Sequence, residues 1–215
     1  TADLKSKTYG DADPELTWLV TAGSLVGTDA PTGKLSRVTG EDIGGYGILP
    51  GSLDFGDNYN VTFIGSDLTI TARSITVTAD LKSKTYGDAD PELTWQVTAG
   101  SLVGTDAPTG KLSRMTGEDV GDYAILPGSL AFGDNYAVSF ASSDLTISSR
   151  PITVTADSQS KTYGDADPEL TWQLTAGSLV GTDTPIGSLS REDGEDVGVY
   201  TIEQGSLAFG GNYCV

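Results

Sequence analysis

The chain repeats itself with a period of 77 residues: residues 9–18 read Tyr-Gly-Asp-Ala-Asp-Pro-Glu-Leu-Thr-Trp, and the same ten residues return at 86–95 and 163–172. A fixed period of this length is typical of a tandem array of small units and not of one large fold. We therefore predict three domains, at residues 1–72, 73–149 and 150–215. Each is large enough to bury a small core of its own.

The first and last repeats are shorter than the middle one. The segment that matches residues 73–77 is absent before Thr1, so we expect the first strand of repeat 1 to be truncated. The segment that matches residues 139–149 is absent after Val215, so we expect repeat 3 to lack its last strand. Because the chain begins and ends at different points of the repeat, we expect it to be an excerpt from a longer array.

Acidic residues dominate the charge of the chain, which carries 12 lysines and arginines, no histidine and a net charge of −18. So few cations argue against binding to nucleic acid or to an anionic membrane surface. Mutual repulsion of the acidic side chains favours an extended, soluble array. No apolar stretch approaches the roughly 20 residues of a membrane helix, so we expect no membrane insertion. The single Cys214 cannot form a disulfide within the chain.

The middle repeat shows the period-two alternation that predicts half-buried β-strands at residues 74–82 and 92–100. The residues expected to face inward in these two strands are Ile75, Val77, Ala79, Leu81, Leu93, Trp95, Val97 and Ala99. Three further strands are predicted around pairs or triplets that share a face, namely Tyr123 with Ile125, Tyr136 with Val138 and Phe140, and Leu145 with Ile147. Residues 111–114 predict a short edge strand, and residues 101–103 a short helical turn.

Glycines and prolines between these runs mark turns, and no long helical stripe is present. The pattern predicts a mainly β domain of about five or six strands per repeat. Only about four residues separate the last strand of one repeat from the first strand of the next, at residues 70–75 and 147–152. Joints this short do not behave as flexible coils, and Pro151 stiffens the second one. We therefore expect a semi-rigid rod.

Two motifs recur in every repeat at fixed spacing. The first is Tyr-Gly-Asp-Ala-Asp-Pro at residues 86–91, and the second is Gly-Glu-x-x-Gly-x-Tyr at residues 117–123. Together they make the chain resemble the MBG domain of the YGX type, a repeat of very large bacterial surface and secreted proteins, over essentially its whole length. The resemblance implies export to an extracellular or cell-surface location, an adhesin-like or filamentous setting, and a β-grasp-like fold. A β-grasp normally carries a helix, so an Ig-like β-sandwich stays open. The resemblance brings no catalytic residues.

Composition leaves little room for catalysis. Without histidine, a nucleophilic triad or histidine-based acid–base chemistry is excluded, and so is a zinc site built on histidine and cysteine. Carboxylate pairs such as Glu118 and Asp119 are the remaining enzymatic option, but nothing places them across a cleft. We therefore expect no enzyme and no catalytic or cofactor-binding residues.

The carboxylates could instead bind calcium, since the pattern Asp-x-Asp-x-Glu offers hard oxygen ligands. The candidate ligands are Asp11, Asp13, Glu15, Asp88, Asp90, Glu92, Asp165, Asp167 and Glu169. The glycine of a calcium loop is missing, because a leucine follows each glutamate. We favour the other interpretation, in which the aspartates make turn hydrogen bonds to the backbone and the glutamates are solvated. If calcium does bind, we expect it near a joint, where it would stiffen the array.

The function expected from these features is structural: a spacer stalk in a bacterial extracellular adhesin or cell-surface filament, with neighbouring repeats of the same chain as its partners. Two alternatives stay open. One is a multivalent array in which each repeat weakly binds a glycan or a matrix protein. The other is a fibre in which sheet edges of neighbouring chains pair.

Overall fold

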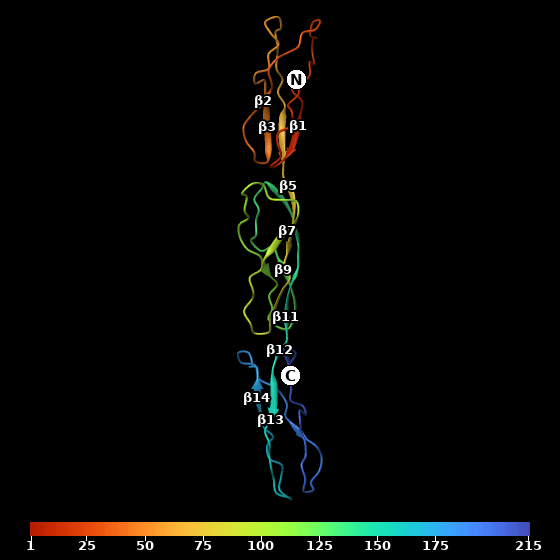
Figure 1. Ribbon diagram of the computed structural model, residues 1–215, viewed down its shortest axis with the longest axis vertical. Coiled ribbons are helices and arrows are strands. Elements are labelled where there is room, and N and C mark those ends of the chain that lie inside the picture. Colours follow the sequence, from red (N-terminus) through yellow and green to blue (C-terminus); the bar gives the residue numbers. More distant parts are fainter. The chain divides into compact units, whose positions relative to one another are not determined.

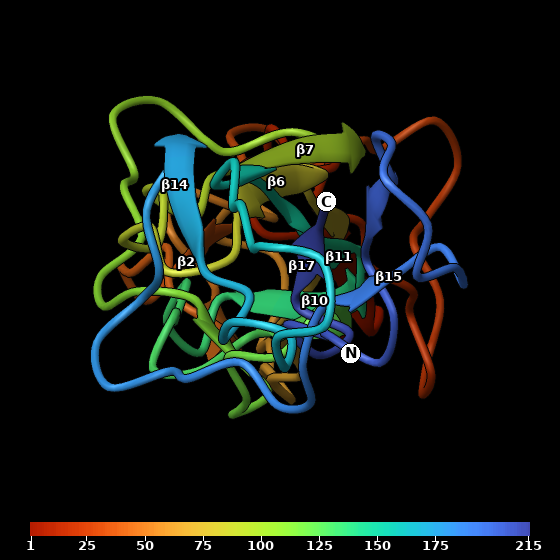
Figure 2. The same cartoon turned by 90° about the horizontal axis from the view of Figure 1, so that it is seen from below.

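Residues 1–215 are all described by the structure, a computed structural model, and they form strands, turns and loops without any helix (Figure 1). Figure 2 shows the same ribbon turned by 90° about the horizontal axis, again with strands and loops and without a helix. The helical turn predicted at residues 101–103 is therefore wrong, because these residues are irregular and lead into a turn at 104–105. No helix in the structure has the length and apolar character that crossing a membrane requires.

The chain divides into two compact units, each of which is described by itself. Unit 1 comprises Thr1–Ala79, Trp95–Lys111 and Pro127–Ala141, and unit 2 comprises Asp80–Thr94, Leu112–Leu126 and Ser142–Val215. The middle repeat alternates between them. The predicted domain boundary at 72/73 lies inside unit 1, and the one at 149/150 lies inside unit 2. Each unit therefore contains a joint, the place where one repeat passes into the next.

Unit 1 contains two sheets. Its strands are β1 (Lys5–Thr8), β2 (Ser36–Arg37), β3 (Gly44–Leu49), β4 (Asp67–Thr71), β5 (Arg73–Ala79), β7 (Trp95–Ala99) and β10 (Tyr136–Ala141). One sheet has the order β1-β4-β3-β2, with β1 parallel and β3 antiparallel to β4. The other has the order β10-β5-β7, with β10 parallel and β7 antiparallel to β5.

Unit 2 contains one four-stranded sheet and three two-stranded sheets. Its strands are β6 (Lys82–Thr85), β8 (Ser113–Arg114), β9 (Gly121–Leu126), β11 (Asp144–Ser148), β12 (Arg150–Pro151), β13 (Thr153–Ala156), β14 (Trp172–Ala176), β15 (Ser190–Arg191), β16 (Ile202–Glu203) and β17 (Tyr213–Cys214). The sheet β6-β11-β9-β8 repeats the order of β1-β4-β3-β2 one period later. The remaining strands pair as β12-β17, β13-β14 and β15-β16.

Burial follows the predicted alternation where the strands are central. Ile75, Val77 and Ala79 of β5 are at most 3 % exposed. Leu81 was predicted to continue this face, but it is 75 % exposed, because β5 ends at Ala79 and the pattern is interrupted before β6 begins. Val138 was expected to share a face with Tyr136 and Phe140, but it is 43 % exposed, whereas Tyr136 of the same strand β10 is 8 % exposed.

The joints are shorter than the four residues predicted from the sequence. Ala72 alone separates β4 from β5, and Ser149 alone separates β11 from β12. In repeat 3 the strand that corresponds to β5 is split into β12 and β13 after Pro151, a residue that has no backbone N–H to donate. One repeat thus continues into the next almost as a single extended strand.

Each joint lies against an apolar core. In unit 1, Ile75, Val77 and Tyr136 form a buried cluster, and in unit 2 a matching cluster consists of Ile152, Leu207, Phe209 and Tyr213. A third cluster, Ala2, Ile48 and Leu68, lies in repeat 1.

Candidate functional site: the joint between repeats

Tyr9, the tyrosine of the repeated motif in repeat 1, reaches into repeat 2. Its backbone N–H donates to the carbonyl oxygen of Thr71 at 2.8 Å, which ties the turn to the end of β4. Its ring packs edge-on against Tyr136, with the ring centroids 5.6 Å apart and the planes at 79°. It also lies against the buried cluster that contains Ile75 and Val77. One repeat therefore contributes an aromatic ring to the core of the next.

Asp106 connects the two tyrosines. Its Oδ2 accepts the hydroxyl of Tyr9 at 2.9 Å and the hydroxyl of Tyr136 at 2.6 Å. The hydroxyl of Tyr136 also accepts the backbone N–H of Val103 at 2.8 Å. The hydrogen bond to Asp106 raises the pKa of Tyr9, while burial and then the same carboxylate raise the pKa of Tyr136. Both hydroxyls stay protonated at neutral pH and hold the contact.

Gly10 follows Tyr9 and is required for both conformation and space. Its φ is +81°, in the left-handed region where a side chain is strained. A Cβ at this position would lie 2.4 Å from Cγ2 of Val103, a residue of repeat 2. The glycine therefore allows the turn of repeat 1 to lie directly on a side chain of its neighbour.

Arg73, the first residue of β5, binds the motif of repeat 1 from the other direction. Its Nε donates to the carbonyl oxygen of Tyr9 at 2.7 Å, and its Nη2 forms an ion pair with Asp11. The Arg73 side chain is 23 % exposed and that of Asp11 is 53 % exposed, so the ion pair itself is partly screened by water. The main contribution of the ion pair is to orient the guanidinium group of Arg73 over the turn that follows Tyr9.

Asn135 adds a further set of contacts to the same joint. Its Nδ2 donates to Oδ1 of Asp42 at 2.8 Å, and its Oδ1 accepts the backbone N–H of Ile43 at 2.9 Å. Its carbonyl oxygen accepts the N–H of Arg73 at 2.9 Å. The second repeated motif of repeat 1, which contains Asp42, is thereby held by repeat 2 as well.

The second joint, in unit 2, repeats these contacts one period later. Tyr86 donates to Asp183 at 2.9 Å, and its ring meets that of Tyr213 at 5.6 Å and 80°. Arg150 donates to the carbonyl oxygen of Tyr86 at 2.7 Å and pairs with Asp88. The remaining matching contacts are those of Gly87 with Val180, and of Asn212 with Asp119 and Val120. The same side chains thus build both joints.

Asp13 and its equivalents, Asp90 and Asp167, each lie in a cluster of four charged residues. In repeat 1 the cluster is formed by Lys7, Asp13, Arg37 and Glu41, and both cations contact both anions. The Lys7 side chain is only 4 % exposed, so its charge is balanced where water has little access. The hydrogen bonds from Arg37, and then from Lys7, hold the pKa of Asp13 at about 2, below its ordinary 3.8.

The second repeated motif places the arginine of this cluster. The Arg37 guanidinium group lies over the ring of Tyr46 at 5.4 Å and donates to the carbonyl oxygen of Gly40 at 2.7 Å. The hydroxyl of Tyr46 donates to the carbonyl oxygen of Asp42 at 2.9 Å. At Gly40, which has a φ of +153°, a Cβ would lie 2.1 Å from Cε1 of Tyr46. The second repeated motif therefore holds the side chain of Arg37 in position.

The predicted calcium ligands are distributed among these ion pairs. Asp11 and Asp88 pair with the joint arginines, and Asp13, Asp90 and Asp167 lie in the four-residue charged clusters. The expected turn hydrogen bonds from the side chains of Asp88 and Asp90 are therefore wrong, because arginine and lysine bind these carboxylates instead. The other candidates, Glu15, Glu92, Asp165 and Glu169, are exposed. No three histidine, cysteine, aspartate or glutamate side chains converge as a metal site would require.

Sequence reasoning missed the partners of these aspartates. It did not single out Asp106, Asn135, Arg73 or the cluster cations Lys7 and Arg37. A signal was present, since each of these residues has an identical counterpart one period away. Charged residues of opposite sign that recur together in this way indicate ion pairs within or between repeats.

Comparison with known proteins agrees with this arrangement. A sequence model of the MBG domain (YGX type) matches the chain three times, at residues 1–69, 75–146 and 152–215. The chain belongs to the MBG family. MBG domains are a non-enzymatic type of repeat and are consistent with the repeat region of a surface protein. No curated protein and no solved structure matches the chain.

Proposed function

We propose that this chain is a stalk segment of a bacterial extracellular adhesin or cell-surface filament, in which MBG repeats follow one another as a rod. The observation that carries the proposal is the joint: Tyr9 and Tyr86 each enter the core of the following repeat through the same set of contacts. Repeats that were joined only by a flexible linker would have no need of an aromatic ring from one repeat in the core of the next.

The joint has the properties that resist bending. A single residue connects the strands, so no flexible linker is available. Several separate contacts hold the joint, among them those of Tyr9, Arg73 and Asn135. Bending would have to break hydrogen bonds and separate packed rings at the same time.

The packing of the tryptophans favours a spacer over a glycan-binding array. Each tryptophan packs edge-on against a phenylalanine, Trp18 with Phe55, Trp95 with Phe132 and Trp172 with Phe209. These rings are therefore engaged in packing, which weakens the case for a glycan-stacking platform on every repeat.

For the fold, the mixture of parallel and antiparallel neighbours around β4 and β5 favours a β-grasp-like over an Ig-like arrangement, whose sheets are mainly antiparallel.

Small-angle X-ray scattering tests the proposal. A compact globule of 215 residues has a radius of gyration of about 17 Å, and we expect a monomer with a radius well above that value. Three glycines inserted after Ala72 should broaden the distance distribution by releasing the first joint. The same insertion after Asp57, in an exposed turn, is the matched control and should leave it unchanged. A wild-type radius near 17 Å, or equal effects of the two insertions, would contradict the stalk.

A further inference from the structure

The first two strands of the middle repeat, β5 and β6, run parallel to its last two strands, β10 and β11. β5 pairs with β10 in unit 1, and β6 pairs with β11 in unit 2. Arg73 lies opposite Tyr136 and Lys82 opposite Leu145, so the offset along the sequence is 63 residues in both ladders. The ladder of β1 with β4 in repeat 1 has the same offset. The beginning and the end of the repeat therefore pair in one constant register.

The chain enters and leaves the middle repeat through strands of this pairing. Ala72 alone joins β4 to β5, and Ser149 alone joins β11 to β12. Tension along the chain would pull β5 toward its amino end and β11 toward its carboxyl end. Parallel strands that are pulled in these opposite directions slide along each other, so all the hydrogen bonds of a ladder share the load at once. If the same strands were pulled apart from one end, the hydrogen bonds would break one after another.

The strands that carry the chain through the first joint are the central strands of their sheets. β4 lies between β1 and β3, and β5 lies between β10 and β7. At the other end of the repeat, β11 lies between β6 and β9. Leu68 of β4, Val77 of β5 and Leu145 of β11 are each 0 % exposed. Sliding one of these strands would have to break a ladder on both sides and expose apolar side chains to water.

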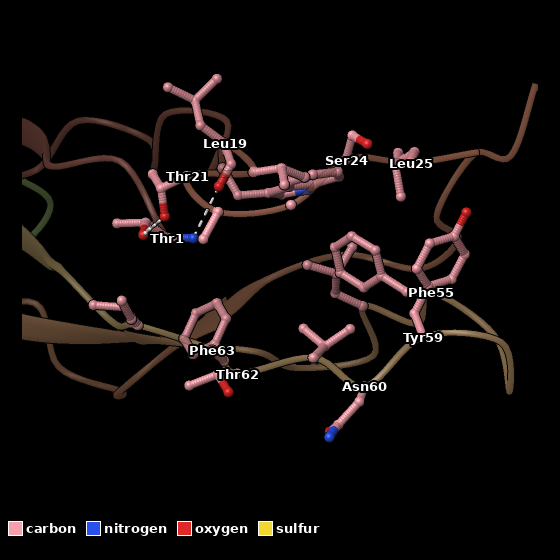
Figure 3. A pocket seen from close by; sticks show the side chains of 17 residues that line it. Thr1, Leu19, Thr21, Ser24, Leu25, Phe55, Tyr59, Asn60, Thr62 and Phe63 are labelled. Atoms are coloured by element: carbon pink, nitrogen blue, oxygen red, sulfur yellow. Dashed lines mark hydrogen bonds between the residues drawn. The ribbon is translucent and has the colours of Figure 1, made fainter. Parts of the chain in front are cut away.

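Side chains also hold β5 to its antiparallel neighbour β7. The hydroxyl groups of Thr78 and Thr98 form a hydrogen bond at 2.8 Å between the two strands. The equivalent pairs of the other repeats, both at 2.9 Å, are Thr1 with Thr21 (Figure 3) and Thr155 with Thr175. A cross-strand contact of this kind adds to the resistance of β5 against sliding.

From this arrangement we propose that the parallel pairing of β5 and β6 with β10 and β11 is a mechanical clamp, which makes a repeat resist tension along the chain. The load enters at Ala72, passes from β5 and β6 to β10 and β11 through the two parallel ladders, and leaves at Ser149. The inference deepens the proposed stalk function, on which it rests for the source of the tension. It adds that the stalk is built to bear force as well as to hold a distance.

Single-molecule force spectroscopy on the whole chain tests the clamp, with pulling handles attached to pairs of introduced cysteines. Cys214→Ser first removes the exposed native thiol. Ala72→Cys with Ser149→Cys then pulls the parallel strands past each other. Ala72→Cys with Asp134→Cys is the matched control, since Asp134 lies in an exposed turn just before β10 and pulls β10 away from β5 from one end. All three attachment sites lie outside the strands, so we expect both variants to keep the wild-type melting temperature.

We expect the first direction of pull to need at least about twice the unfolding force of the second at the same pulling speed, because its ladders are loaded together. The gain in length identifies each event. Fully extended, the 77 residues from Ala72 to Ser149 span about 28 nm, and the 62 residues from Ala72 to Asp134 span about 22 nm.

Equal forces in the two directions, or a lower force in the first, would overturn the clamp. The stalk itself is tested by scattering, so the two proposals can fail separately. An extended chain with equal forces would refute the clamp alone. A compact chain whose unfolding force depends on the direction of pull would refute the stalk alone.

Discussion

Tyr9 donates its phenolic hydrogen to Asp106, 97 residues further along the chain, over 2.9 Å and across a repeat boundary. Tyr86 makes the same contact with Asp183 at the same distance. Tyr163, at the corresponding position of repeat 3, is instead 71 % exposed. The chain therefore contains two engaged copies and one exposed copy of the same side chain, which provides a control for every test of the joint.

The Tyr86→Phe variant should lower the melting temperature by about 2–4 °C, the shift typical of losing one hydrogen bond in a chain of this size. Its hydroxyl is the donor to Asp183, and the ring contact with Tyr213 is retained. Tyr163→Phe should leave the melting temperature unchanged. Both are measured by circular dichroism, and equal shifts for the two variants would show that the hydroxyl of Tyr86 does not hold the joint.

Gly87→Ala should destabilise the protein more than Gly164→Ala. Both glycines have positive φ, +84° and +89°, so both variants incur the cost of about 1–2 kcal/mol for a side chain in this region. Only Gly87 faces a neighbour, since its Cβ would lie 2.3 Å from Val180, while nothing lies within 4 Å at Gly164. Overpacking of this kind adds about 1–3 kcal/mol.

Urea unfolding of the two alanine variants measures the difference in the free energy of unfolding. Scattering should also show a perturbed second joint in Gly87→Ala alone. If the two variants lose the same stability, the close approach of Val180 to the turn is not present in solution.

The sequence predicted the strands well and the joint poorly, for a physical reason. Alternation along a strand reports which face is buried, so Ile75, Val77, Leu145 and Ile147 were identified correctly as core. It does not report where a strand ends, and Leu81 was misplaced for that reason. The joint depends on pairs such as Tyr9 with Asp106, which no local pattern connects.

The candidate site illustrates the same limit. Asp11, Asp13 and Glu15 were singled out together because their spacing resembles a set of metal ligands. In the structure they diverge: Asp11 pairs with Arg73, Asp13 lies in the charged cluster with Lys7, and Glu15 is exposed. Spacing in the sequence shows which carboxylates are near one another, but the cations that bind them come from other strands.

Acid should destabilise the protein mainly between about pH 4 and pH 2. The arginines of the charged clusters hold the pKa values of Asp13, Asp90 and Asp167 at about 2, against an ordinary value of 3.8. The unfolded chain therefore takes up protons first as the pH falls, so this stabilisation is complete above about pH 4 and is lost as the pH approaches 2. Thermal melts across this range should show a steep fall in melting temperature.

The Asp90→Asn variant is the control for the acid prediction. It removes one of the three carboxylates with lowered pKa values, so its melting temperature should be lower than that of the wild type at pH 7 and should depend less steeply on pH below 4. A wild-type melting temperature that stays constant from pH 5 down to pH 2 would be incompatible with the lowered pKa values.

Calcium should not stabilise the folded chain. Binding of a divalent cation at Asp88 or Asp90 would have to displace Arg150, or Arg114 and Lys84, from the carboxylates that they contact. The Lys84 side chain is only 4 % exposed, and losing its contact with Asp90 would leave this buried ammonium group with Glu118 as its remaining counter-charge. Adding millimolar calcium to a chelated sample should therefore leave the melting temperature unchanged, as should magnesium at the same ionic strength. A rise with calcium alone would show that the ion pairs are replaced by a metal site and would restore the stiffening role predicted for calcium at the joints.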